Sequence, residues 1–176
     1  MPPFASVSHP PATQPFVQPY YMKAKLLTAF EDSGTTPDPN PDFVKDMVEQ
    51  FNGTNSNFGN WDSSNNYWLC PKTGTYKIYG QITFDARDND RLHDARVILS
   101  VNDAQKAFST LNLLTGNQGH DDDMDIASLN VTTILHITQN QQVKLKYRYV
   151  SDTATGVRIQ GGGASDKTFL LIERIE

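Results

Sequence analysis

The residues of this sequence best suited to chemistry are four aspartates in one short segment. They are Asp121, Asp122, Asp123 and Asp125, directly after His120. Ca²⁺ takes about six to eight oxygen ligands, which carboxylates and backbone carbonyls at this density could supply. The spacing differs from that of an EF-hand loop, however, and a run of aspartates is more often a solvated surface loop. We therefore expect no resident cofactor, and Ca²⁺ binding at these aspartates is the alternative.

No other group of residues has the spacing of a catalytic site. The histidines His9, His93, His120 and His136 are scattered, and the sequence has no nucleophile elbow, phosphate-binding loop or paired catalytic carboxylates. The single cysteine excludes an internal disulfide, and its position at the start of a strand predicts a buried core side chain. A cupin-like enzyme would need a His-x-His and Glu metal set, which is missing. The sequence therefore predicts a protein that is not an enzyme.

Composition limits the possible partners. The 176 residues are enough for one domain with a small appendage, and the net charge of −5 argues against binding to nucleic acid, which requires clustered Lys and Arg. No apolar stretch approaches the roughly 18 residues of a membrane helix, so we expect no membrane insertion. The first residues lack the basic and apolar regions of a secretory signal. We expect the protein to act where it is made, and the alternative is a leader removed before this numbering begins.

Residues 1–21 differ from the rest of the chain. They hold six of the ten prolines and no Lys, Arg, Asp or Glu, which predicts an extended, polyproline-like arm. A disordered tail is the alternative, but disordered segments are usually poor in aromatic residues. We predict that the aromatic residues of the arm dock into pockets on a partner or a neighbouring subunit. These residues are Phe4, Phe16, Tyr20 and Tyr21.

Residues 22–176 have the pattern of an all-β domain. In the segment 75–84, apolar and polar residues alternate with a period of two, which is typical of a half-buried strand. Similar alternation occurs in residues 22–30, 95–101, 127–137 and 143–149, with a final strand at 169–175. The apolar residues of segment 43–51 have a helical spacing, which predicts a short helix or turn. Residues 52–66 are expected to form a long polar loop and residues 161–163 a flexible glycine turn. Short strands without a βαβ rhythm predict an antiparallel jelly-roll sandwich.

One motif carries a family resemblance. The pattern Cys-Pro-x-x-Gly-x-Tyr at residues 70–76, leading into the alternating strand, resembles the globular head of the complement 1q-type and tumour-necrosis-factor (TNF) superfamily. Residues 97–102, 135–143 and 168–172 are similar to later strands of that family, although Asn140-Gln141-Gln142 replaces the usual Gly-Asp. The resemblance covers residues 22–176.

The resemblance implies a jelly roll that assembles as a homotrimer around a threefold axis. Two strands that line this axis in the family each carry one large apolar or aromatic residue on an otherwise polar face, namely Tyr79 and Ile134. The closing strand is apolar on both faces, as expected of a strand between the core and a partner. We therefore predict trimer-interface residues at Tyr79, Ile134, Leu170 and Ile172.

Two classes of function fit this sequence. The first is a virion structural protein: a trimeric capsid cement or decoration protein, spike or head fibre. Residues 1–21 would anchor it to a capsid or other virion protein. The second is a secreted or cell-surface ligand or lectin of the complement-like type, which would act outside the cell on protein or carbohydrate. The second class usually carries a leader or a collagen-like stalk, so we favour a location in the virion.

Overall fold

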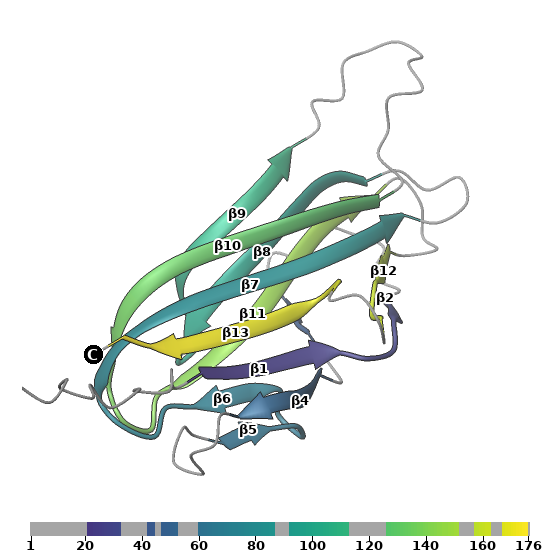
Figure 1. Cartoon of the computed structure of the whole chain (residues 1–176). Coiled ribbons are helices and arrows are strands. Elements are labelled where there is room, and N and C mark those ends of the chain that lie inside the picture. The colour runs from purple at the N-terminus through teal and green to yellow at the C-terminus, as the bar shows by residue number, and fades with distance from the viewer. Residues whose placement is uncertain are drawn as a thin grey trace, which may run out of the picture.

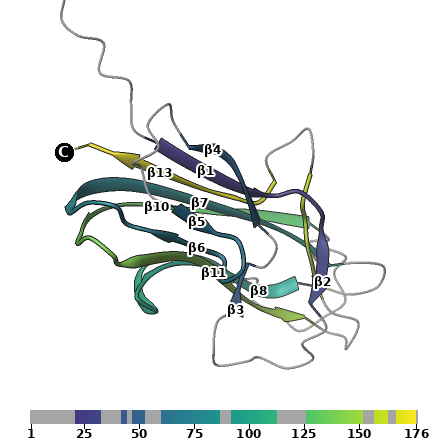
Figure 2. The same cartoon turned by 90° about the horizontal axis from the view of Figure 1, so that it is seen from below.

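Two antiparallel sheets lie face to face in the computed structural model of the chain (Figure 1, Figure 2). The structure describes residues 21–32, 42–44, 47–52, 60–86, 92–112, 126–151, 157–162 and 167–175. The described residues contain strands and no helix. The predicted all-β jelly-roll class is confirmed.

The first sheet, sheet A, is seven-stranded with the order β2-β12-β7-β13-β1-β4, and β10 pairs with β7. Its strands are β1 (Tyr21–Leu26), β2 (Phe30–Asp32), β4 (Met47–Asn52), β7 (Gly74–Ala86), β10 (Ile126–Ile137), β12 (Val157–Ile159) and β13 (Phe169–Arg174). The second, sheet B, is six-stranded with the order β5-β6-β11-β8-β9, and β3 pairs with β11. Its strands are β3 (Asp42–Phe43), β5 (Asn60–Asp62), β6 (Tyr67–Leu69), β8 (Leu92–Val101), β9 (Ala104–Asn112) and β11 (Gln142–Ser151).

The alternation predicted in β7 is confirmed. The four apolar side chains of its inner face are fully buried between the sheets: Tyr76, Ile78, Ile82 and Phe84. Gly80 lies on the same face, opposite leucines of sheet B. A Cβ atom at Gly80 would lie 2.5 Å from Cδ1 of Leu145 and 3.3 Å from Cδ2 of Leu99. Glycine at this position therefore leaves room for the side chains of the facing sheet.

Aromatic side chains fill the two ends of the core. Trp68 is fully buried and packs edge-on against Tyr76, with ring centroids 5.3 Å apart. Near the other end of β7, Phe84 packs edge-on against Tyr147 of β11 at 6.3 Å. Edge-to-face pairs place the positive ring edge over the negative ring face, which adds to the energy of burial. Both pairs join sheet A to sheet B.

The Cys-Pro-x-x-Gly-x-Tyr motif ties two turns together. The backbone N–H of Cys70 donates to the carbonyl of Gln141 (2.9 Å), and the carbonyl of Cys70 accepts from the N–H of Asn140 (2.8 Å). The hydroxyl of Tyr76 donates to the carbonyl of Lys72. Cys70 itself is buried, and burial raises the pKa of its thiol. The motif thus fixes the start of β7 against the turn between β10 and β11, and Cys70 is the predicted core residue.

The helix predicted at residues 43–51 is wrong. This segment forms β3 and β4: β4 pairs antiparallel with β1, and the N–H of Val44 donates to the carbonyl of Leu145 (3.0 Å). The pairing surface offered by β1 and β11 overrides the helical spacing of the apolar residues, since local preference is weaker than tertiary contact. The predicted loop 52–66 also contains a strand, β5, whose Trp61 donates its indole N–H to the carbonyl of Met47 (2.9 Å).

Gly161 is a close-packing position, whereas the sequence predicted a flexible turn. A Cβ atom there would lie 2.7 Å from the carbonyl carbon of Thr28 and 2.8 Å from the nitrogen of Ala29. Its neighbours are held on both sides, because Gln160 N–H donates to Thr83 O (2.9 Å) and Gly162 N–H donates to Leu26 O (3.2 Å). The absence of a side chain lets this segment lie directly on the backbone that follows β1.

Candidate interaction surface

The outward side of sheet A presents side chains of β10, β7, β13 and β1, which we call the open face. The register of these strands arranges its residues in rows across the sheet. Three of these rows are Ile134–Lys77–Glu173–Tyr21, Thr132–Tyr79–Leu171–Lys23 and Asn130–Gln81–Phe169–Lys25. The middle of each row holds β7 and β13, so the apolar and aromatic residues of those strands form the centre of the face.

An aromatic stack lies at this centre. Tyr79 and Phe169 stack with ring centroids 5.3 Å apart and planes 25° from parallel. Nζ of Lys23 lies 4.8 Å from the centre of the Phe169 ring, and the hydroxyl of Tyr79 donates to Oε1 of Gln81 (3.1 Å). Beside the stack, the Ile134 side chain on β10 is 59% exposed. The open face therefore combines a half-buried aromatic centre with an exposed apolar side chain, a composition typical of protein–protein contacts.

The predicted interface residues divide into two groups. Tyr79 and Ile134 lie on the open face. Leu170 and Ile172 do not: both are fully buried in the chain's own core, so their prediction as interface residues is wrong. The outward residues of β13 are Phe169 and Leu171. Because β13 is apolar on both faces, its sequence carries no signal of which face is inward. The pairing between strands decides which face is outward, because Leu171 lies in register with Tyr79 and Lys23 of the open face.

Several predicted residues lie outside the described part of the chain. These are Phe4, Phe16 and Tyr20 of the arm, and Asp121, Asp122, Asp123 and Asp125 of the acidic segment. Tyr21, which the sequence assigned to the arm, is the first residue of β1 and pairs with Glu173. Within the described ranges, no three His, Cys, Asp or Glu side chains gather as a metal site. The same ranges contain no helix long and apolar enough to cross a membrane.

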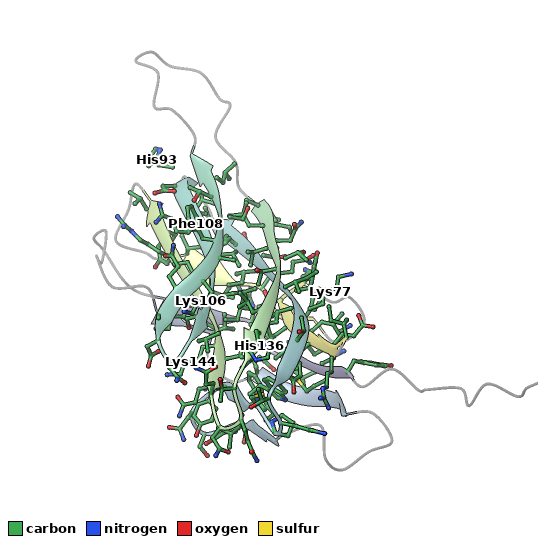
Figure 3. All side chains as sticks on the ribbon, turned by 90° about the vertical axis from the view of Figure 1, so that its left-hand side faces the viewer. Lys77, His93, Lys106, Phe108, His136 and Lys144 are labelled. Carbon is green, nitrogen blue, oxygen red and sulfur yellow. The ribbon has the colours of Figure 1, made fainter. Side chains whose placement is uncertain are left out.

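The outward side of sheet B has a different character, with cations on its two longest neighbouring strands. Lys144, Lys146 and Arg148 alternate along β11, and Arg96 lies on β8. Asp103, in the turn between β8 and β9, contacts Nζ of Lys144 at 3.0 Å and Nζ of Lys146 at 2.8 Å. The two ammonium groups lower the pKa of the Asp103 carboxyl, with Lys146 the larger cause. Figure 3 shows Lys106, Phe108 and Lys144 on this side of the molecule and Lys77 on the side of sheet A.

The Asp103 ion pairs predict a pH-dependent contribution to stability. Since the pKa of Asp103 is lower in the folded chain than its ordinary 3.8, these pairs stabilise the fold above that pH and are lost as the pH falls through the folded-state value. The Asp103 side chain is 58% exposed, so we expect Asp103→Asn to lower the free energy of unfolding by only about 0.5 kcal/mol at neutral pH. Asparagine tolerates the positive φ of 63° at this position, so the turn should stay intact.

Urea unfolding of both proteins at pH 7 and at a pH below the folded-state pKa of Asp103, which is itself lower than 3.8, measures this effect. The difference between wild type and Asp103→Asn should be present at pH 7 and should disappear at the acidic pH. Equal stabilities at pH 7, or a difference that grows in acid, would contradict the assigned ion pairs.

Comparison with known proteins defines the fold. No protein-family model matches the chain, and no curated protein is similar enough in sequence to match it. Among solved structures, the Eiger TNF of S. frugiperda is similar over 90% of this chain and 93% of its own, with a TM-score of 0.58 and 11% sequence identity. At this identity the likeness shows the fold alone. The chain is a TNF-like jelly roll, as the 70–76 motif predicted.

Proposed function

We propose that this protein is a non-enzymatic subunit of a homotrimer and that the open face of sheet A is the contact between subunits. The aromatic stack of Tyr79 and Phe169 carries this proposal. An isolated subunit would leave this stack and the neighbouring Ile134, which is 59% exposed, in contact with water. Burial of such a face against other copies removes its apolar area from water, which is favourable by about 25 cal/mol per Å².

Two further features support a trimer. The TNF-like fold and the 70–76 motif both resemble a superfamily in which the same sheet surrounds a threefold axis. Lys23 and Lys25 lie at the β1 ends of their rows, with Nζ of Lys23 over the Phe169 ring, and Lys77 lies beside Glu173 in the neighbouring row. Lysine side chains can cover apolar area with their methylene groups and keep the ammonium group in water. Charges at the edge of an apolar centre are the usual arrangement of an interface.

For the biological setting we propose a virion structural protein, a capsid decoration, spike or head-fibre trimer held by residues 1–20. The composition of this arm supports the proposal, because prolines pre-extend the chain and its aromatic residues have no core of their own. A secreted or cell-surface ligand is the second candidate. It is favoured by the similar solved structure, which is described as a TNF.

Removal of residues 1–20 distinguishes the two settings. The shortened chain keeps Tyr21 and hence all of β1, so it should fold as the full chain does. If the arm anchors the protein, full-length protein should co-sediment with the particles it decorates and the shortened chain should stay in solution. The attachment should also resist salt, because the arm has no charged side chain apart from histidine. Full occupancy by the shortened chain would contradict an anchoring role, and a protein that is found free rather than on particles would favour the secreted ligand.

A further inference from the structure

The cations on sheet B form a patch that the proposed trimer contact does not use. Arg148 of β11 lies directly opposite Arg96 of β8 in the register, and Lys146 and Lys144 follow along β11. The whole chain has a net charge of −5, so this patch is locally opposite in sign to the molecule. Like charges directly opposite each other in a sheet are destabilising. A facing arginine pair therefore calls for a compensating anion.

Unsatisfied polar atoms are concentrated on the same two strands. Among the described residues, four buried side-chain atoms lack a hydrogen-bond partner: Nε of Arg96, Nε of Arg148, Oγ of Ser100 and Oδ1 of Asp94. Arg96 and Ser100 belong to β8, whose pairing places them opposite Arg148 and Lys144. Buried polar atoms in native proteins almost always have partners, and an atom left without one carries a penalty. All four atoms belong to residues on the outward side of β8 and β11, where each is buried beneath neighbouring side chains.

We propose that the outward side of β8 and β11 binds an extended acidic segment of a partner polypeptide. Alternate residues of a strand lie about 6.6–6.8 Å apart, so carboxylates at alternate positions of an extended peptide match the repeat of Lys144, Lys146 and Arg148. The guanidinium groups of Arg96 and Arg148 can each hold a carboxylate through two parallel hydrogen bonds. With a carboxylate bound to each guanidinium group, the repulsion between Arg96 and Arg148 is offset.

The other residues of this side favour a polypeptide over a uniform polyanion. Asp94 and Asp103 lie on or beside the patch, and Asp103 already pairs with Lys144 and Lys146, so the positive charge is interrupted rather than continuous. Phe108 of β9 is 54% exposed, and the Arg96 guanidinium lies 5.0 Å from its ring centre. This ring offers a contact to an apolar residue between the acidic ones (Figure 3).

Fluorescence anisotropy with a labelled peptide of alternating Glu and Val tests the proposal on the full-length chain. The wild-type protein should bind this peptide with an affinity that falls as salt is added, and should not bind the matching Lys and Val peptide. The double variant Arg96→Gln/Arg148→Gln should bind at least about 10-fold more weakly, since charge-assisted hydrogen bonds are lost. The single variant Arg148→Lys should fall between the two, because lysine keeps the charge and loses the planar fork.

Lys72→Gln is the matched control, since it removes one charge from an exposed turn before β7. It should bind the acidic peptide as the wild type does. The double variant should melt at or above the wild-type temperature. The substitutions remove two buried arginine Nε atoms that have no partner in the wild type, and they also remove the facing charges. Three results would each overturn the proposal: no binding of the acidic peptide to the wild type, equal binding by the double variant, or tighter binding of heparin or a single-stranded oligonucleotide than of the peptide.

Discussion

Replacing Ile134 with lysine should convert the proposed trimer into monomers and leave the fold intact. The Ile134 side chain is 59% exposed in the single chain, so the substitution leaves the core unchanged. In the proposed trimer the new ammonium group would lie directly opposite Lys77, whose other neighbour Glu173 can offset only one of the two charges. An unpaired buried charge is unfavourable by about 3–5 kcal/mol, which corresponds to a loss of affinity of more than about 100-fold at each contact.

Light scattering at micromolar concentration measures this change. The wild-type protein should have three times the chain mass of 19.7 kDa, and Ile134→Lys should have the mass of one chain. Ile134→Asp should dissociate less, because Lys77 can pair with its carboxylate. Phe108→Lys is the matched control, with an aromatic side chain that is 54% exposed on sheet B, and it should remain a trimer. A monomeric wild type, or dissociation by Phe108→Lys alone, would refute the open face as the contact.

Alanine at Gly161 should destabilise the fold more than alanine at Gly80. Both Cβ atoms would meet neighbours closer than 3.0 Å, but the neighbours differ in kind. At Gly80 the obstacle is the end of the Leu145 side chain, which can rotate, so we expect a loss of about 1–2 kcal/mol in the free energy of unfolding. At Gly161 the obstacles are backbone atoms of Thr28 and Ala29, and hydrogen bonds of Gln160 and Gly162 hold the glycine's own segment against them. There we expect a loss of about 3 kcal/mol.

Urea unfolding of the two variants measures the difference, and circular dichroism before denaturation tests whether each variant is folded at the start. The reverse order of stabilities would show that the segment at Gly161 moves freely away from Thr28. In that case the glycine run would be the flexible turn that the sequence predicted.

The sequence predicted the long strands well because their period is unambiguous. In β7, β10 and β11 one face is apolar over many residues, and alternation alone identifies the buried side. The sequence-based prediction failed at residues 43–51, whose apolar residues have a helical spacing. This segment pairs with distant strands of the chain, and such pairing leaves no local pattern in the sequence. The prediction also failed for Leu170 and Ile172, where both faces of the strand are apolar and alternation cannot distinguish them.

The candidate surfaces were predictable only in part. Tyr79 and Ile134 were found because each interrupts a polar face, whereas Phe169 was missed because Leu170 and Ile172 of the same strand were chosen in its place. The alternation of Lys144, Lys146 and Arg148 is visible in the sequence, but it reads as a solvated face. What distinguishes it is Arg96, which lies about 50 residues away and becomes its neighbour only through the pairing of β8 with β11. Cross-strand register is therefore the information that the sequence lacked.

The position of β13 has a consequence for how the protein is made. Of the described strands it is the last to leave the ribosome, yet it lies between β1 and β7 and pairs with both. Until residues 169–174 emerge, the edges of β1 and β7 that pair with β13 in the finished fold have no partner. Open edges of this kind are ready templates for wrong pairing with another nascent chain. Pairing between two incomplete chains through these edges is therefore a hazard of the interval before β13 becomes available.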